Sequence, residues 1–193
     1  MRRIAQVISN ILNPIVLLFP APYFLVLRTT NDGAIALRWA VFSWIFLLLI
    51  SVIIIYCVRR GIFSDLDVSK REQRPLLFLF SAMLTFFYCL FVFLLGGPYI
   101  LIVTALGLLF GILVFSIINS RVKASIHVAT ISALLFTLGI VYSGVYLLLF
   151  LLIPLVGWAR VKTGRHTVSE TIAGSVIGSL LTLFMYIIVK YLF

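Results

Sequence analysis

The longest uncharged stretch of the chain runs from Pro75 to Ser120 and contains no Asp, Glu, Lys or Arg. So long an apolar stretch suits a lipid bilayer, where every backbone N–H and C=O group has to be paired inside the protein. Helices meet this requirement, and the short alternating strands of a membrane barrel are absent from the sequence. The rest of the chain is similar, because 64% of its 193 residues are hydrophobic and only 10% are charged. We therefore expect an all-α, polytopic membrane helix bundle.

Charged and turn-forming residues divide the chain into about six to seven transmembrane helices. A helix needs about 20 apolar residues to cross a bilayer, and Trp39–Val58 meets this length without a charge. Gly96-Gly97-Pro98 predicts a turn between two further spans, and Ser143-Gly144 is the expected break within Ser125–Ala159. The other expected spans are Ile11–Leu27, which Pro14, Pro20 and Pro22 should bend, and Thr171–Val189. Residues 1–193 are expected to form a single integral-membrane domain.

The chain is strongly basic, with a formal net charge of +10. Its Lys and Arg residues cluster in the loops between apolar segments, where lipid headgroups and phosphate are better partners than nucleic acid. We expect membrane lipids as partners and no nucleic acid, and the sequence does not indicate an oligomeric state. Cys57 and Cys89 lie inside apolar spans and are expected to be free thiols.

The stretch from Trp158 to Glu170, W-A-R-V-K-T-G-R-H-T-V-S-E, places polar side chains between two long apolar segments. If His166 opens a helix, Glu170 lies one turn further on the same face. A carboxylate there can hold the imidazole in one tautomer, while Arg160 can grip a phosphate with its planar guanidinium group. The stretch therefore predicts a site for a phosphorylated lipid. Two structural interpretations stay open: Thr167-x-x-Glu170 is also a helix-capping box, and the basic residues can be interfacial anchors.

Two other polar stretches lie in loops that seven crossings would bring to the same membrane face. The first, Ser64 to Pro75, carries Lys70, Arg71 and Arg74 before a predicted helix. The second, Arg121 to Val128, carries Lys123, Ser125 and His127. Together with the third stretch they would supply cations, a hydroxyl group, two histidines and a carboxylate. Two histidines suit phosphoryl transfer, one as the nucleophile and one as the acid for the leaving oxygen. Taken alone, Ser125 is equally consistent with a helix cap and His127 with a buried, hydrogen-bonded histidine.

These three stretches resemble the signature motifs of the type-2 phosphatidic acid phosphatase family, which is related to the vanadium haloperoxidases. The family's third motif, Ser-Arg-x5-His-x3-Asp, is matched by Ala159-Arg160, His166 and Glu170, and its second, Pro-Ser-Gly-His, by Ala124-Ser125-Ile126-His127. The first motif, Lys-x6-Arg-Pro, keeps Arg74-Pro75 but has Asp67 at the lysine position. The resemblance covers residues 65–193. Ile126 in place of Gly and Glu170 in place of Asp are further departures, which raise the chance of an altered substrate or of lost activity.

The resemblance implies a membrane lipid phosphatase that hydrolyses a lipid phosphate or diphosphate monoester, polyprenyl or glycerolipid, through a phosphohistidine. His166 would be the nucleophile, Glu170 would orient it, and His127 would protonate the leaving group. No cofactor and no metal ion are expected. The phosphate oxygens would be held by basic and hydroxyl side chains, with Lys70 or Arg71 replacing the missing lysine: Arg74, Arg160, Ser125, Arg71, Lys70 and Lys123.

Two alternative functions remain. Asp65-x-Asp67 allows a metal-dependent prenyl or alcohol phosphotransferase, because paired aspartates can hold Mg²⁺ on a diphosphate. A catalytically decayed site would leave a lipid-phosphate-binding membrane protein.

The distribution of basic residues predicts the orientation in the membrane. Twelve Lys and Arg residues lie on the expected face of the three polar stretches and three lie on the other. Short loops rich in Lys and Arg stay in the cytoplasm. We therefore expect an integral protein of the cell (plasma) membrane with its site on the cytoplasmic face.

Overall fold

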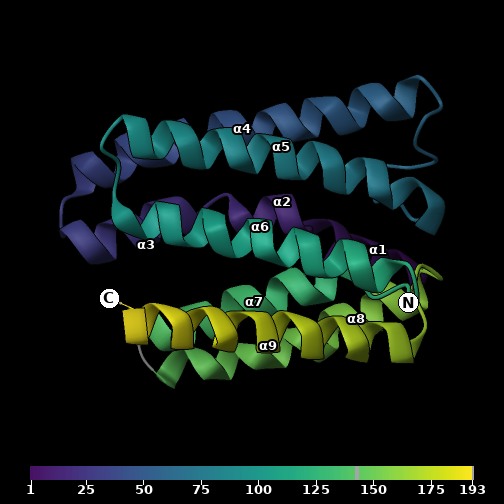
Figure 1. Ribbon diagram of the computed structural model, residues 1–193. Coiled ribbons are helices and arrows are strands. Elements are labelled where there is room, and N and C mark those ends of the chain that lie inside the picture. Colours follow the sequence, from purple (N-terminus) through teal and green to yellow (C-terminus); the bar gives the residue numbers. More distant parts are fainter. Residues whose placement is uncertain (142–143, 193) are drawn as a thin grey trace. The chain divides into compact units, whose positions relative to one another are not determined.

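The computed structural model describes residues 1–141 and 144–192, and all regular structure in this part of the chain is helical (Figure 1). An all-α fold is therefore confirmed for the described residues. The elements, in chain order, are α1 (Arg2–Ile11), α2 (Pro14–Leu18), α3 (Ala21–Thr30), α4 (Gly33–Arg59), the 3-10 helix η1 (Arg71–Gln73), α5 (Arg74–Leu94), α6 (Tyr99–Asn119), α7 (Ile126–Val141), the 3-10 helix η2 (Gly144–Leu151), α8 (Leu152–Lys162) and α9 (Val168–Leu192).

The chain divides into two compact units. One unit combines Met1–Leu18 with Val122–Phe193, and the other is continuous from Phe19 to Arg121. The first unit holds the third polar stretch and all of the second except Arg121, and we call it the terminal unit because it contains both ends of the given sequence. The second holds the first polar stretch and is called the central unit. Whether residues 1–193 act as a single domain remains a prediction.

The central unit is built from α3, α4, α5 and α6. Its buried core includes Val26 of α3, Trp39 of α4, Val92 of α5 and Leu101 of α6. Helices α5 and α6 run side by side and are joined by a short turn, visible in Figure 1. This turn contains Gly96-Gly97-Pro98, as predicted, since α5 ends at Leu94 and α6 begins at Tyr99.

Helix α4 begins earlier than the span Trp39–Val58 that hydropathy indicates. The Asp32 side chain accepts hydrogen bonds from the backbone N–H groups of Ala34 and Ile35, at 2.8 and 3.0 Å. Such a cap satisfies N–H groups that have no partner within the helix, so the helix starts at the cap and not at the first apolar run. The connection between α3, which ends at Thr30, and α4, which begins at Gly33, is correspondingly short.

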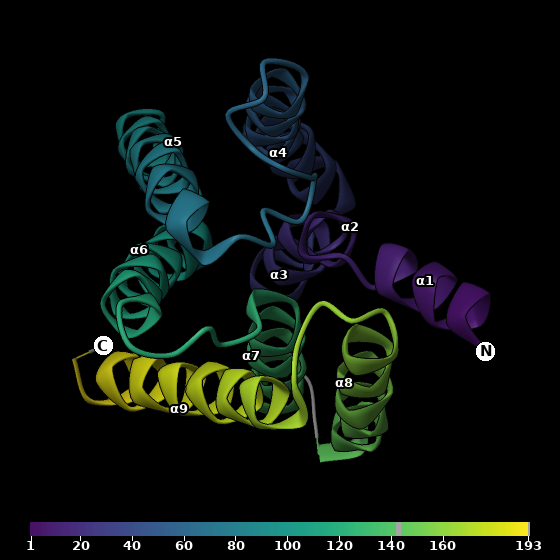
Figure 2. The ribbon, with the colours of Figure 1, turned by 90° about the vertical axis from the view of Figure 1, so that its right-hand side faces the viewer.

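In the terminal unit, the closest helix packing joins α7 to α9 (Figure 2). Gly174 and Gly178 of α9 make this packing possible. A Cβ atom at Gly174 would lie 2.5 Å from the Ser125 backbone oxygen, and one at Gly178 would lie 2.2 Å from that of Ala129. Only glycine permits so close an approach, as in the G-x-x-x-G contacts of membrane helices. Ser132 on α7 also donates a hydrogen bond to Ser175 on α9, at 3.2 Å.

The N-terminal segment forms three short helices, α1 to α3, in place of one continuous helix. Helix α1 packs against α8 through a face of small residues, and Ala5 and Ser9 are buried there. The side chains of Ile4, Val7 and Ile11 form an exposed apolar stripe on α1. A helix with polar residues on one side and such a stripe on another is typical of a membrane interface.

The number of membrane crossings differs from the sequence prediction. Within the described residues, four helical segments are long and apolar enough to cross a bilayer: Gly33–Arg59, Arg71–Leu94, Tyr99–Asn119 and Val168–Ile188. Arg2–Leu18 and Ala21–Thr30 together meet the same test as one broken span, which gives up to five. Helices α7 and α8 are shorter than the roughly 20 residues that a crossing needs. The count of six to seven is therefore not confirmed, and Ser143 of the expected Ser143-Gly144 break lies outside the described residues.

Candidate functional site

His166 and Glu170 form the best-defined polar pair of the terminal unit. Nδ1 of His166 lies 2.8 Å from Oε2 of Glu170, and the imidazole is buried. Because a carboxylate oxygen only accepts, Nδ1 carries the proton and the lone pair of the neutral ring lies on Nε2; this tautomer is assigned from the hydrogen bond. A buried histidine held in this way presents a defined nucleophilic nitrogen.

Glu170 also caps α9, so both interpretations of its spacing apply together. Its Oε2 atom accepts a hydrogen bond from the Thr167 backbone N–H at 3.2 Å, and the Thr167 hydroxyl accepts one from the Glu170 N–H at 3.3 Å. These reciprocal bonds are those of a capping box. The same carboxylate oxygen thus fixes the start of α9 and the orientation of His166.

Arg160 lies at the end of α8, in the turn that leads to His166. Its backbone oxygen accepts hydrogen bonds from the N–H groups of Arg165, at 3.1 Å, and His166, at 3.3 Å. Gly164, with a φ of 74°, supplies the left-handed residue of this turn. The Arg160 side chain is only 1% exposed, and its Nη1 donates to the hydroxyl oxygen of Ser9 at 2.9 Å. The turn therefore holds the arginine and the histidine of the third stretch next to each other.

Ser125 connects the second stretch to the third. Its backbone N–H donates to the Glu170 backbone oxygen at 3.0 Å, which joins the start of α7 to the first turn of α9. Its hydroxyl oxygen is fully buried and has no hydrogen-bond partner among the described residues. The side chain therefore does not cap α7. A buried hydroxyl group without a partner is costly, and it is suited to a ligand that supplies one.

His127 is buried in the first turn of α7 and contacts the N-terminal segment. Nε2 of His127 lies 3.4 Å from Nδ2 of Asn13, a residue of the junction between α1 and α2. The Asn13 amide is oriented by its oxygen, which accepts a hydrogen bond from the Ile15 N–H at 3.0 Å. Its NH₂ group therefore faces the imidazole.

The remaining predicted phosphate ligands are divided between the two units. In the terminal unit, Nζ of Lys123 donates to the Arg165 backbone oxygen at 3.2 Å, so this lysine supports the turn before His166. In the central unit, Arg74 is buried and donates through Nη1 to the Asn119 side chain at 3.4 Å. Arg71 donates to the backbone oxygens of Asn119 and Ser120, where it stabilises the end of α6. Lys70 is exposed.

The acidic residues of the first stretch organise their own loop. Both carboxylate oxygens of Asp65 accept hydrogen bonds, Oδ2 from the Ser64 hydroxyl and Oδ1 from the Ser69 hydroxyl and the Asp67 N–H. Within residues 1–141 and 144–192, no three His, Cys, Asp or Glu side chains are grouped so that they would hold a metal ion. The metal-dependent alternative therefore gains no support from this loop.

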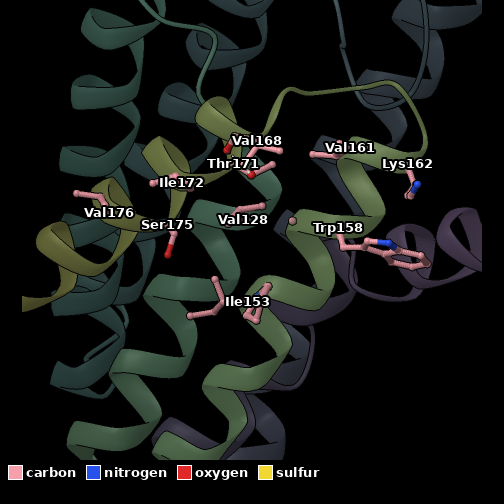
Figure 3. A pocket seen from close by; sticks show the side chains of 12 residues that line it. Val128, Ile153, Trp158, Val161, Lys162, Val168, Thr171, Ile172, Ser175 and Val176 are labelled. Atoms are coloured by element: carbon pink, nitrogen blue, oxygen red, sulfur yellow. Dashed lines mark hydrogen bonds between the residues drawn. The ribbon is translucent and has the colours of Figure 1, made fainter.

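An apolar groove of about 470 Å³ is formed by residues of α7, α8 and α9 in the terminal unit (Figure 3). Side chains of α9, among them Thr171 and Ile172, line one side, and Trp158 and Val161 of α8 line the other. Three of its lining residues are near neighbours of the motif residues in the chain: Val128 follows His127, Val161 follows Arg160, and Val168 is two residues after His166. The motif residues themselves are not among the residues that line the groove.

Sequence reasoning missed Ser9, Asn13 and the two α9 glycines. The glycines had a readable signal, because Gly174-x-x-x-Gly178 lies in an apolar segment. Ser9 and Asn13 are one helical turn apart, but nothing in the sequence pairs them with residues more than a hundred positions away.

Comparison with known protein families finds a match in the C-terminal part of the chain. The model of the PAP2 superfamily matches residues 122–193 and does not extend to Arg74-Pro75. No curated protein and no solved structure matches the chain. The matched family supports phosphatase-type chemistry on phosphate esters in general. Residues 122–193, which hold Ser125, His127, Arg160, His166 and Glu170, are thus similar to the PAP2 superfamily, the group that includes the type-2 phosphatidic acid phosphatases.

Proposed function

We propose that this protein hydrolyses a lipid phosphate or diphosphate monoester through a phosphohistidine formed on His166. The observation that carries the proposal is the buried His166 imidazole with Nδ1 held by Glu170 at 2.8 Å, which leaves the lone pair on Nε2. The bond from Ser125 N–H to the Glu170 backbone oxygen brings the second motif next to this pair. Helices α7 and α9 both begin here, and the positive ends of helices favour an anion.

The proposed reaction has two displacement steps. In the first, the Nε2 lone pair of His166 attacks phosphorus, and an N–P bond forms while the P–O bond to the lipid breaks. The leaving oxygen takes the Nε2 proton of His127 in its imidazolium form, which becomes the neutral ring. In the second, a water oxygen attacks phosphorus, its proton passes to His127, and the N–P bond breaks to return the electron pair to Nε2. Arg160 and the Ser125 hydroxyl stabilise the charge on the phosphoryl oxygens. The substitution of Glu for the family's Asp is compatible with this role, because Glu170 reaches Nδ1 while it caps its own helix.

The apolar groove supports a lipid as the substrate. A phosphate bound beside His166 and Arg160 would have its apolar chain next to Val128, Val161 and Val168. When a polyprenyl or acyl chain is buried in such surroundings, each CH₂ group contributes about 0.8 kcal/mol of favourable free energy. Lys162 and Trp158 at the groove suit the headgroup region, where long basic and aromatic side chains anchor membrane proteins. Membrane lipids and the lipid phosphate are the proposed partners.

The loop charges support a location of the site on the cytoplasmic face of the cell membrane. Helix α9 tests this, because Ser169 and Tyr191 lie at its two ends and are both exposed. In a background with Cys57 and Cys89 replaced by serine, an impermeant thiol reagent on intact cells should label Tyr191→Cys and not Ser169→Cys. Labelling of Ser169→Cys alone would reverse the orientation.

Replacement of the nucleophile tests the chemistry directly. We expect purified wild-type protein to release phosphate from one or more of polyprenyl phosphate, polyprenyl diphosphate, phosphatidate and phosphatidylglycerol phosphate, with full activity in EDTA. Vanadate should inhibit, since it adopts the five-coordinate geometry of the transition state. His166→Ala should abolish turnover.

Thr167→Ala is the matched control for this experiment. It removes the hydroxyl that accepts from the Glu170 N–H but leaves the carboxylate on His166. We expect this variant to retain turnover. Its free energy of unfolding should fall by about 1 kcal/mol, which is typical for the loss of a helix cap. Turnover that EDTA abolishes would support the metal-dependent alternative, and turnover that persists in His166→Ala would refute the proposed nucleophile.

A bulky side chain in the groove should discriminate between long and short substrates. Ile172→Trp fills part of the groove, so kcat/KM should fall more for a long-chain lipid phosphate than for a short-chain one. Leu183→Trp is the control, because Leu183 is exposed three turns further along α9 and is not among the groove residues. Equal losses for long and short substrates in Ile172→Trp would contradict binding of the chain in this groove.

A further inference from the structure

The N-terminal segment contributes two polar side chains to the buried polar residues of the terminal unit. Ser9 lies in the last turn of α1, and Asn13 follows one turn later in the junction with α2. Ser9 contacts Arg160 and Asn13 contacts His127, so each meets a residue with a role in the proposed reaction. The matched family region begins at residue 122 and contains neither Ser9 nor Asn13.

The contact of Ser9 with Arg160 is between two buried side chains. Ser9 is 2% exposed and its oxygen accepts from Nη1 of Arg160 at 2.9 Å. A hydrogen bond to a buried guanidinium is strong and directional, because the group is planar and its N–H bonds have fixed directions. Ser9 therefore helps to set the plane in which Arg160 presents its other N–H groups.

The contact of Asn13 with His127 sets a tautomer. The Asn13 oxygen is occupied by the Ile15 N–H, so the group that faces Nε2 is the NH₂ donor. A donor at this position requires a lone pair on Nε2, and the proton of the neutral ring then lies on Nδ1. Asn13 therefore restrains both the rotation of the ring and the position of its proton.

We propose that the α1–α2 segment is a working part of the site, in which Ser9 and Asn13 are positioning residues for Arg160 and His127. The small face of α1 that packs on α8 brings Ser9 close enough to reach the guanidinium. The proposal rests on the proposed phosphatase function for its effect on turnover, but the tautomer of His127 is independent of that function.

Two substitutions remove these contacts with little other change. Ser9→Ala deletes the acceptor. Asn13→Ser keeps a good cap for α2, since serine and asparagine cap helices about equally well, but its side chain is too short to reach His127. Asn10→Ser is the matched control, because Asn10 is exposed on α1 and its side chain bonds only to Gln6 among the contacts of the described residues.

The kinetic measurements use vanadate and two phosphate esters that differ in their leaving groups. Ser9→Ala should raise the inhibition constant of vanadate about tenfold, the effect expected when a hydrogen bond to a charged group is lost. Asn13→Ser should lower kcat about tenfold for a lipid phosphate, because the Asn13 NH₂ group stabilises the neutral ring that remains after imidazolium His127 has given its Nε2 proton to the leaving oxygen. The loss should be much smaller for p-nitrophenyl phosphate, whose leaving group needs no acid. Asn10→Ser should match the wild type. Equal losses for both esters in Asn13→Ser, or unchanged vanadate inhibition in Ser9→Ala, would overturn the proposal.

¹⁵N NMR of histidine-labelled protein in detergent tests the contact without any turnover. The chain has two histidines, so the spectrum of His166→Ala assigns the signals of His127. Neutral His127 should show the Nδ1–H tautomer with an acceptor shift at Nε2, and Asn13→Ser should lose that shift. An Nε2–H tautomer, or a spectrum unchanged by Asn13→Ser, would overturn the proposal. A protein that hydrolyses no phosphate ester but gives the expected spectra would refute the proposed function and leave the positioning contact in place.

Discussion

The bond from the Ser125 N–H to the Glu170 backbone oxygen, 3.0 Å long, links the two motif stretches of the terminal unit. It forms only because α7 and α9 approach closely, and Gly174 permits this by leaving room for the Ser125 backbone. Once the two helix starts are joined, the turn from Arg160 to His166 places the buried arginine and histidine beside them. The arrangement of the site thus depends on backbone packing between two apolar helices, and the reactive side chains follow from it.

Glu170 shows that structural and chemical interpretations of one motif need not compete. Its carboxylate accepts from Thr167 N–H, which starts α9, and from His166 Nδ1, which fixes the tautomer. A rigid helix start is a sound support for a nucleophile, because positions within a helix are better defined than those in a loop. Ser125 contrasts with it: its buried hydroxyl has no partner among the described residues, so a helix-capping role does not explain it.

Local features were predictable from the sequence, and distant contacts were not. The helical character, the turn at Gly96-Gly97-Pro98 and the His166–Glu170 pair follow from composition and from spacings of a few residues. The early start of α4 was missed because hydropathy ignores the Asp32 cap. The six to seven crossings assumed that each apolar stretch spans the bilayer, whereas α7 and α8 are too short by the usual length requirement. The bonds of Ser9 to Arg160 and Asn13 to His127 join opposite ends of the chain, and no local pattern encodes them.

The central claim is that the His166 ring is the group that becomes phosphorylated, and trapping the intermediate tests it most directly. A lipid substrate with a ³²P-labelled phosphate is mixed with the protein, turnover is stopped within milliseconds in alkaline denaturant, and the labelled peptide is sequenced by mass spectrometry. Phosphohistidine survives alkali and is lost in acid, which distinguishes it from phosphoserine and from an acyl phosphate. The account predicts a label on the peptide that contains His166, attached at Nε2. Label on any other residue, or turnover that proceeds with no trapped protein phosphate under conditions where substrate is saturating, would contradict it.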